Sequence, residues 1–126
     1  VAILSFGAGL GDCLEAADLL ARAHIAATVA DARFAKPLDA ALVARLARGH
    51  SLLVTVEHGS TGGFSAQVLT TLARTGIHCP VLPLTLPDRF VDHGTPMEQA
   101  EECGLTAEGI VRAIGERLAA RGDGRS

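Results

Sequence analysis

Three glycines near the start of the chain could bring the backbone close to a phosphate. The apolar run 1–6 is followed by Gly7, Gly9 and Gly11. This spacing resembles the opening of a dinucleotide-binding unit, where glycines let a pyrophosphate approach the main chain. Asp12 replaces the third glycine of that fingerprint, and its carboxylate would repel an anion. We favour a tight turn in which Asp12 is the N-cap of a helix, with nucleotide or anion binding at this turn as the alternative.

Charged residues are dense after the second apolar run. Asp31 lies where a dinucleotide-binding unit keeps its ribose-binding carboxylate, and Arg33 and Lys36 could clamp a phosphate or carboxylate. The same residues, with Asp39, could instead form ion pairs that fix the loop or contact another domain. The second interpretation is the one we favour.

Two further polar groups follow apolar runs. Glu57 and His58 could do acid–base chemistry, but no nucleophile stands at a suitable spacing, so a polar loop at an interface is favoured. His93 has no spaced partner for a metal site. We predict no catalytic, cofactor-binding or metal-binding residue in this chain. The candidate domain-interface or anion-contacting residues are Asp31, Arg33, Lys36, Asp39, Glu57, Asp88, Arg89 and His93.

Apolar runs typical of buried strands alternate with segments of helical periodicity. The strands are predicted over 1–6, 27–32, 52–56 and 81–86. The helices are predicted over 13–24, 39–48 and 64–74, with a short one from Thr95 and a last one from Thr106. Gly49 and Gly76 are expected to end the second and third helices.

This alternation predicts a three-layer α/β/α domain with a mainly parallel sheet of about four strands. Pro83 lies within the fourth strand and cannot donate a hydrogen bond to a neighbour, so that strand belongs at an edge and the expected order is 2-1-3-4. We expect residues 1–120 to form one domain and 121–126 a frayed tail.

Composition narrows the class of protein. The 126 residues are 48% hydrophobic and 20% charged, which suits one globular domain. The net charge of −3 and the lack of a basic stripe argue against nucleic-acid binding, and no apolar run reaches the length of a membrane span. Cys13, Cys79 and Cys103 form no CxxC pair, which favours reduced thiols in the cytoplasm. A start at Val1 inside a strand predicts a piece of a longer polypeptide.

Four stretches together resemble the C-terminal domain of transketolase-like thiamine diphosphate enzymes, from Val1 to about Leu118. They read VAILSFGAG, DARFAKPLD, VTVEHGSTGGFSAQVL and LPDRFVDHGTPMEQAEECGLTAEGI. The last stretch favours the 1-deoxy-D-xylulose-5-phosphate synthases, with transketolases and 2-oxoacid dehydrogenase β subunits as alternatives. His58 departs from the pattern, since the family often has a second acid after Glu57.

The resemblance implies a homodimer of three-domain chains that condenses pyruvate with glyceraldehyde 3-phosphate, releasing carbon dioxide. Thiamine diphosphate and Mg²⁺ would be bound outside this chain, and the product would feed isoprenoid, thiamine and pyridoxal synthesis. This chain would be a structural, non-catalytic domain that contacts the preceding domains and helps form the dimer. Folds of this family carry another antiparallel strand before the first one here, and without it the strand near Val29 would lie exposed at an edge or pair with something else.

Overall fold

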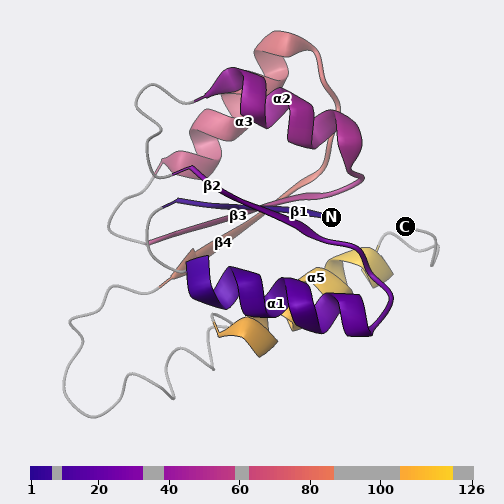
Figure 1. Cartoon of the computed structure of the whole chain (residues 1–126). Coiled ribbons are helices and arrows are strands. Elements are labelled where there is room, and N and C mark those ends of the chain that lie inside the picture. The colour runs from indigo at the N-terminus through magenta and orange to yellow at the C-terminus, as the bar shows by residue number, and fades with distance from the viewer. Residues whose placement is uncertain (7–9, 33–38, 59–62, 87–105, 121–126) are drawn as a thin grey trace.

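A computed structural model describes residues 1–6, 10–32, 39–58, 63–86 and 106–120. Strands and helices alternate in this part of the chain (Figure 1). The strands are β1 (Ala2–Ser5), β2 (Thr28–Asp31), β3 (Leu53–His58) and β4 (Val81–Leu86), and the helices are α1 (Leu10–Arg22), α2 (Ala40–Gly49), α3 (Phe64–Thr75) and α5 (Ala107–Ala120). The short helix predicted from Thr95 lies outside the described residues.

The four strands form one parallel sheet in the order β2-β1-β3-β4, as predicted. The edge position of β4 agrees with its proline. Pro83 pairs in register with Thr55, and Leu53 donates a backbone hydrogen bond to the carbonyl of Pro80. Along a parallel strand, the backbone N–H and C=O groups of alternate residues point to the same side. Because Pro80 faces β3, Pro83 faces away from it, and its missing N–H removes no hydrogen bond from the sheet. β2 forms the other edge, as expected for the strand near Val29.

Helices cover both faces of the sheet, with α1 and α5 on one side and α2 and α3 on the other (Figure 1). Successive strand residues point to opposite faces, so the apolar strands supply two cores. Ile3, Val54 and Val56 pack against α1 and α5, while Ala2, Leu4 and Leu53 pack against α2 and α3. The fold is therefore the predicted three-layer α/β/α arrangement.

The boundaries of α1 differ from the sequence-based prediction at both ends. The helix begins at Leu10, so Asp12 lies inside its first turn and is not the N-cap. A carboxylate there still interacts favourably with the helix dipole, so its residue type does not distinguish the two positions. At the other end the helix stops at Arg22, and His24 adopts a left-handed conformation with φ of 66°. This reversal brings Ile25 back to donate to the carbonyl of Leu20.

The C-terminus of α2 also differs from the prediction, because Gly49 lies inside the helix and His50 is the C-cap in an extended conformation, whereas three other helix ends agree. Asp39 caps α2 by accepting a hydrogen bond from the backbone of Leu42 at 3.1 Å. Thr106 caps α5 by accepting one from the backbone of Gly109 at 3.1 Å. Gly76 ends α3 in a left-handed conformation with φ of 73°. These caps depend on residues three or four apart, which is why the sequence reveals them. No helix in the described ranges is both long and apolar enough to span a membrane.

Candidate functional site

The carboxyl ends of β1 and β3 form the place where open α/β sheets usually bind ligands. The two strands are neighbours, and the helices that follow them, α1 and α3, leave toward opposite faces of the sheet. Such a switch point opens a crevice between the departing chains. The side chains beside it are Ser5 and Phe6 from the first strand end and Glu57 from the second.

Glu57 fills the α3 side of this crevice. Its carboxylate is 4% exposed and accepts hydrogen bonds from the backbone N–H groups of Phe64 at 3.0 Å and Ser65 at 3.1 Å. Gly63, the N-cap of α3, has no side chain to do this, so the preceding strand supplies the acceptor. A negative charge at a helix N-terminus also interacts favourably with the helix dipole. Glu57 therefore occupies the position where α3 would otherwise bind an anion.

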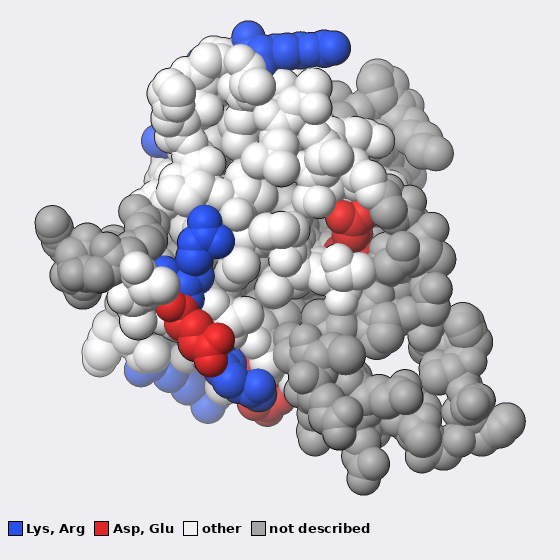
Figure 2. All heavy atoms as spheres, turned by 180° about the vertical axis from the view of Figure 1, so that it is seen from behind, with Lys and Arg blue, Asp and Glu red and all other residues white. Residues whose placement is uncertain are grey.

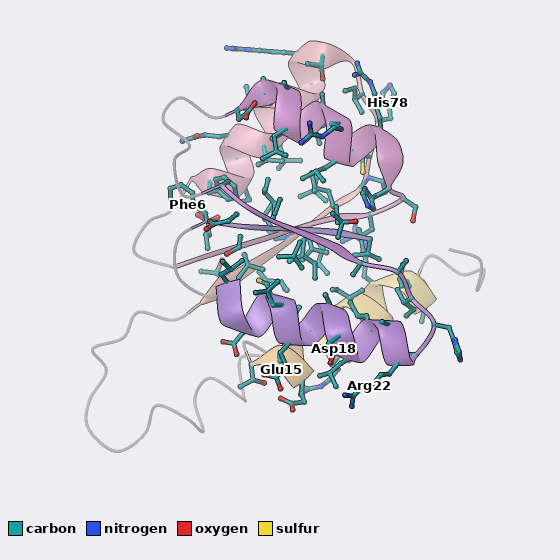
Figure 3. All side chains as sticks on the ribbon, in the orientation of Figure 1. Phe6, Glu15, Asp18, Arg22 and His78 are labelled. Carbon is teal, nitrogen blue, oxygen red and sulfur yellow. The ribbon has the colours of Figure 1, made fainter. Side chains whose placement is uncertain are left out.

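Two aromatic rings pack beside that carboxylate. The rings of Phe6 and Phe64 are stacked with centroids 4.7 Å apart and planes 18° from parallel. Phe64 is 2% exposed, and Phe6 lies at the carboxyl end of β1 (Figure 3). The stack joins the first strand to the start of α3 and adds apolar contact where a ligand would need polar groups.

The α1 side of the crevice holds a buried thiol. Burial raises the pKa of Cys13 to about 11; the negative charges of Asp12 and Asp31 act in the same direction, while the Ser5 hydroxyl lowers it. That last contact is weak, because Ser5 Oγ is fully buried without a hydrogen bond of good geometry in the described part of the chain. Cys13 is itself fully buried, so it is a neutral packing residue despite its place near a helix N-terminus.

The described residues do not fit a diphosphate or its metal ion. Carboxylates stand at the N-terminal ends of three helices, Asp12 at α1, Asp39 at α2 and Glu57 at α3. Each would oppose a bound phosphate. Within the described ranges no group of three or more His, Cys, Asp or Glu side chains could hold a metal ion. The glycines at 7 and 9 lie outside those ranges.

Three of the predicted site residues lie in the described part of the chain, and they do not form one site. Asp39 and Glu57 each cap a helix, and Asp31 lies at the end of β2 in register with Ser5. Their predicted part in a domain interface or anion contact stays a prediction. The other candidates, Arg33, Lys36, Asp88, Arg89 and His93, lie outside the described residues.

One structural contact has no counterpart in the sequence analysis. The Nδ1 of His50 lies 2.8 Å from the carbonyl oxygen of Leu46, and its Nε2 lies 3.0 Å from the hydroxyl of Thr28. The carbonyl can only accept, so Nδ1 carries a proton. The ring ties the end of α2 to the start of β2. A histidine directly after Gly49 is the only sequence signal, since the two partners are 22 residues apart.

Comparison with known proteins agrees with this fold. Residues 1–110 match the family described as transketolase, C-terminal domain. The chain belongs to this family. It is 54% identical over 119 residues to a 1-deoxy-D-xylulose-5-phosphate synthase of Cupriavidus taiwanensis, a match that covers 94% of this chain and 18% of the synthase.

Solved structures show the same relationship. A split-gene transketolase, described as an inactive beta4 tetramer, is 33% identical with a TM-score of 0.78, covering 94% of this chain and 39% of that one. A transketolase of Campylobacter jejuni is 19% identical with a TM-score of 0.59, covering 91% and 16%, and supports the fold alone. The chain thus spans less than a fifth of the curated relative and well under half of either solved chain.

Proposed function

We propose that this chain is the C-terminal domain of a 1-deoxy-D-xylulose-5-phosphate synthase and that its role there is structural. The domain comprises residues 1–120, followed by a tail. The full polypeptide is a cytoplasmic homodimer that condenses pyruvate with glyceraldehyde 3-phosphate and releases carbon dioxide. Thiamine diphosphate supplies the carbanion chemistry, and it is held with Mg²⁺ by the preceding domains. This chain contacts those domains and helps to form the dimer.

The synthase is favoured over the other members of the family by sequence identity. The chain is 54% identical to the synthase and 33% identical to the split-gene transketolase, and each match covers 94% of its length. The residue pattern of the stretch after β4 also favours the synthase, but this stretch lies outside the described residues. The choice of the synthase therefore depends on sequence and not on the structure.

The observation that carries the structural role is the buried carboxylate of Glu57. At the switch point of the sheet, where an α/β enzyme would usually bind its ligand, the α3 N-terminus is already satisfied at 3.0 and 3.1 Å by a side chain of the same chain. A phosphate could bind there only by displacing a carboxylate that is 4% exposed. This arrangement supports a packing role in preference to nucleotide or anion binding.

Titration calorimetry tests the proposal. Thiamine diphosphate with Mg²⁺ should give no binding heat with residues 1–126, and pyruvate with glyceraldehyde 3-phosphate should give no product. A polypeptide that restores the preceding domains should bind the cofactor and form 1-deoxyxylulose 5-phosphate. Turnover by the 126 residues alone would contradict the structural role. Micromolar binding of NAD, ATP or a sugar phosphate, weakened by Gly9→Val, would favour the anion-binding alternative instead.

A further inference from the structure

Charged residues are unevenly distributed along the sequence. Of the 29 residues from Gly59 to Pro87, only Arg74 is Asp, Glu, Lys or Arg, whereas 24 of the other 97 residues are charged. The described part of this segment forms α3 and β4. By contrast, α1 and α5 carry four charged residues each. On α1, the side chains of Glu15, Asp18 and Arg22 project away from the sheet, as a solvated helix face does (Figure 3).

The charge-poor segment lies on one side of the molecule. α3 and β4 are at the back of the view in Figure 1 and face the viewer in Figure 2. Most of the Lys, Arg, Asp and Glu atoms on this side lie along one lower flank and at the top, with one acidic group to the right of the centre, and the surface between them is uncharged. Loss of charged residues, rather than overall hydrophobicity, is what distinguishes the centre of a protein interface from ordinary surface.

The helix handedness places an exposed leucine beside the uncovered strand. α3 runs antiparallel to the strands and turns Phe64, Val68 and Leu72 toward the sheet. In a right-handed helix of that direction the residue after Val68 points to the flank toward β4, away from α2. That residue is Leu69, and it is 50% exposed.

The outer strand supplies the rest of the surface. Val81 packs into the core beneath α2 and α3, so the alternation of a strand turns Pro83 and Thr85 to the same face of the sheet. Both of these side chains are exposed, because α3 covers β3 and does not reach across β4. We call Leu69, Val81, Pro83 and Thr85 the α3–β4 face. Its edge lacks an N–H at Pro83, which disfavours an added strand and favours a partner that packs on side chains.

We propose that the α3–β4 face is where the preceding domains of the same polypeptide dock, an inference that rests on the proposed function. The matched relatives all carry much more chain than this domain, which covers 18% of the synthase and 39% of the split-gene transketolase chain. A domain with that much polypeptide attached must present one surface to it. The α3–β4 face has the composition of such a surface, and the docked region must be uncharged and largely apolar where it meets Leu69.

The chain offers a matched control. Leu14 on α1 is 54% exposed, close to the 50% of Leu69, but it lies among Asp12, Glu15 and Asp18. The two leucines therefore have the same residue type, helical setting and exposure, and differ in the charge of their surroundings. The same substitution at each position separates docking from a general effect of adding charge.

The test compares Leu69→Arg with Leu14→Arg in the full polypeptide, by limited proteolysis at the junction before this domain. An arginine forced into a closed apolar contact should speed the release of the domain about tenfold, while Leu14→Arg should stay within about twofold of the wild type. Leu69→Ser, which adds no charge, should lie between them. Equal release from the two arginine variants would overturn the proposal.

Two further measurements distinguish failure of the docking proposal from failure of the proposed synthase function. Light scattering decides between partners: if Leu69→Arg lowers the oligomeric mass without speeding release, a second copy occupies the face and the proposal is wrong. Synthase activity of the wild-type polypeptide tests the proposed function alone. An inactive polypeptide that still releases this domain faster with Leu69→Arg would leave the docking face in place and remove the synthase assignment.

Discussion

The two helical layers of this domain close their helices in different ways. In the α2/α3 layer the described helix ends are closed by residues whose chemistry suits each position. Asp39 and Glu57 accept backbone hydrogen bonds, and Gly76 adopts the left-handed conformation. On the opposite face, α1 is followed by a histidine, His24, in the left-handed conformation. Among the described residues, buried hydroxyls without a hydrogen bond occur on both faces of the sheet, Ser5 toward α1 and Thr55 toward α2 and α3, so the layers differ in how their helices end.

The helix C-termini give the clearest form of this difference. Ile77 donates to the carbonyl of Leu72 after Gly76, and Ile25 donates to the carbonyl of Leu20 after His24. The hydrogen-bond pattern is the same, but a side chain at positive φ is strained and glycine is not. The C-terminus of α3 is therefore free of the backbone strain that His24 carries at the end of α1.

Removing the carboxylate of Glu57 should give the largest effect. Glu57→Ala leaves two N–H groups of α3 buried without an acceptor, and we expect a loss of about 3 kcal/mol of folding free energy. Glu57→Gln keeps one acceptor oxygen and should lose about half as much. Urea denaturation measures both, with Glu116→Ala on the exposed side of α5 as control. A loss no larger than that of the control would show that the cap contributes little.

Asp39 caps α2 at an exposed position, so its removal should cost less. Asp39→Ala is expected to lose about 1 kcal/mol, and Asp39→Ser, which keeps an acceptor, a few tenths. The same denaturation experiment ranks these variants against those at Glu57. If Asp39→Ala proved the more destabilising, burial would not be the reason that the α3 cap matters.

Exchanging the residue types at His24 and Gly76, which follow the C-termini of α1 and α3, tests the backbone strain after α1. His24→Gly should stabilise the domain by about 0.5 to 1 kcal/mol, because it relieves a positive φ at an exposed site. Gly76→His should destabilise it by a similar amount. Thermal unfolding of the two single variants gives the values. A stabilising Gly76→His would contradict the assignment of strain to the left-handed conformation.

The buried thiol of Cys13 on α1 should make stability independent of its ionisation near neutral pH and sensitive to it in alkali. The pKa of Cys13 is raised from 9.0 to about 11 by burial, so the unfolded chain loses this proton first. Its contribution to stability is full below pH 9 and falls as the pH rises toward 11. In Cys13→Ala that part of the alkaline decline should disappear. An unchanged pH profile would mean that the thiol ionises freely in the folded state.

Local signals explain most of what the sequence predicts correctly. Apolar strand runs and the proline of β4 indicate the strand order, and the caps at Asp39 and Thr106 lie within three residues of their partners. For Glu57 the sequence suggests acid–base chemistry or an interface and not a cap, because its contact crosses from one element to the next over seven residues. Nothing in the residue type of His24 signals a left-handed turn, so helical periodicity predicts an end for α1 at that histidine and not before it.

The proline in β4 also limits how copies of this domain could associate through their backbones. A sheet with two open edges can join head to tail, the first edge of one copy against the last edge of the next, and such pairing repeats without end. Pro83 removes a donor from the middle of the β4 edge, so of the two edges in the described sheet β2 is the better suited to strand pairing. Pairing the β2 edges of two copies is two-fold symmetric and occupies both β2 strands, so it would give a closed pair. Pro83 thus favours a closed pair over an open-ended assembly.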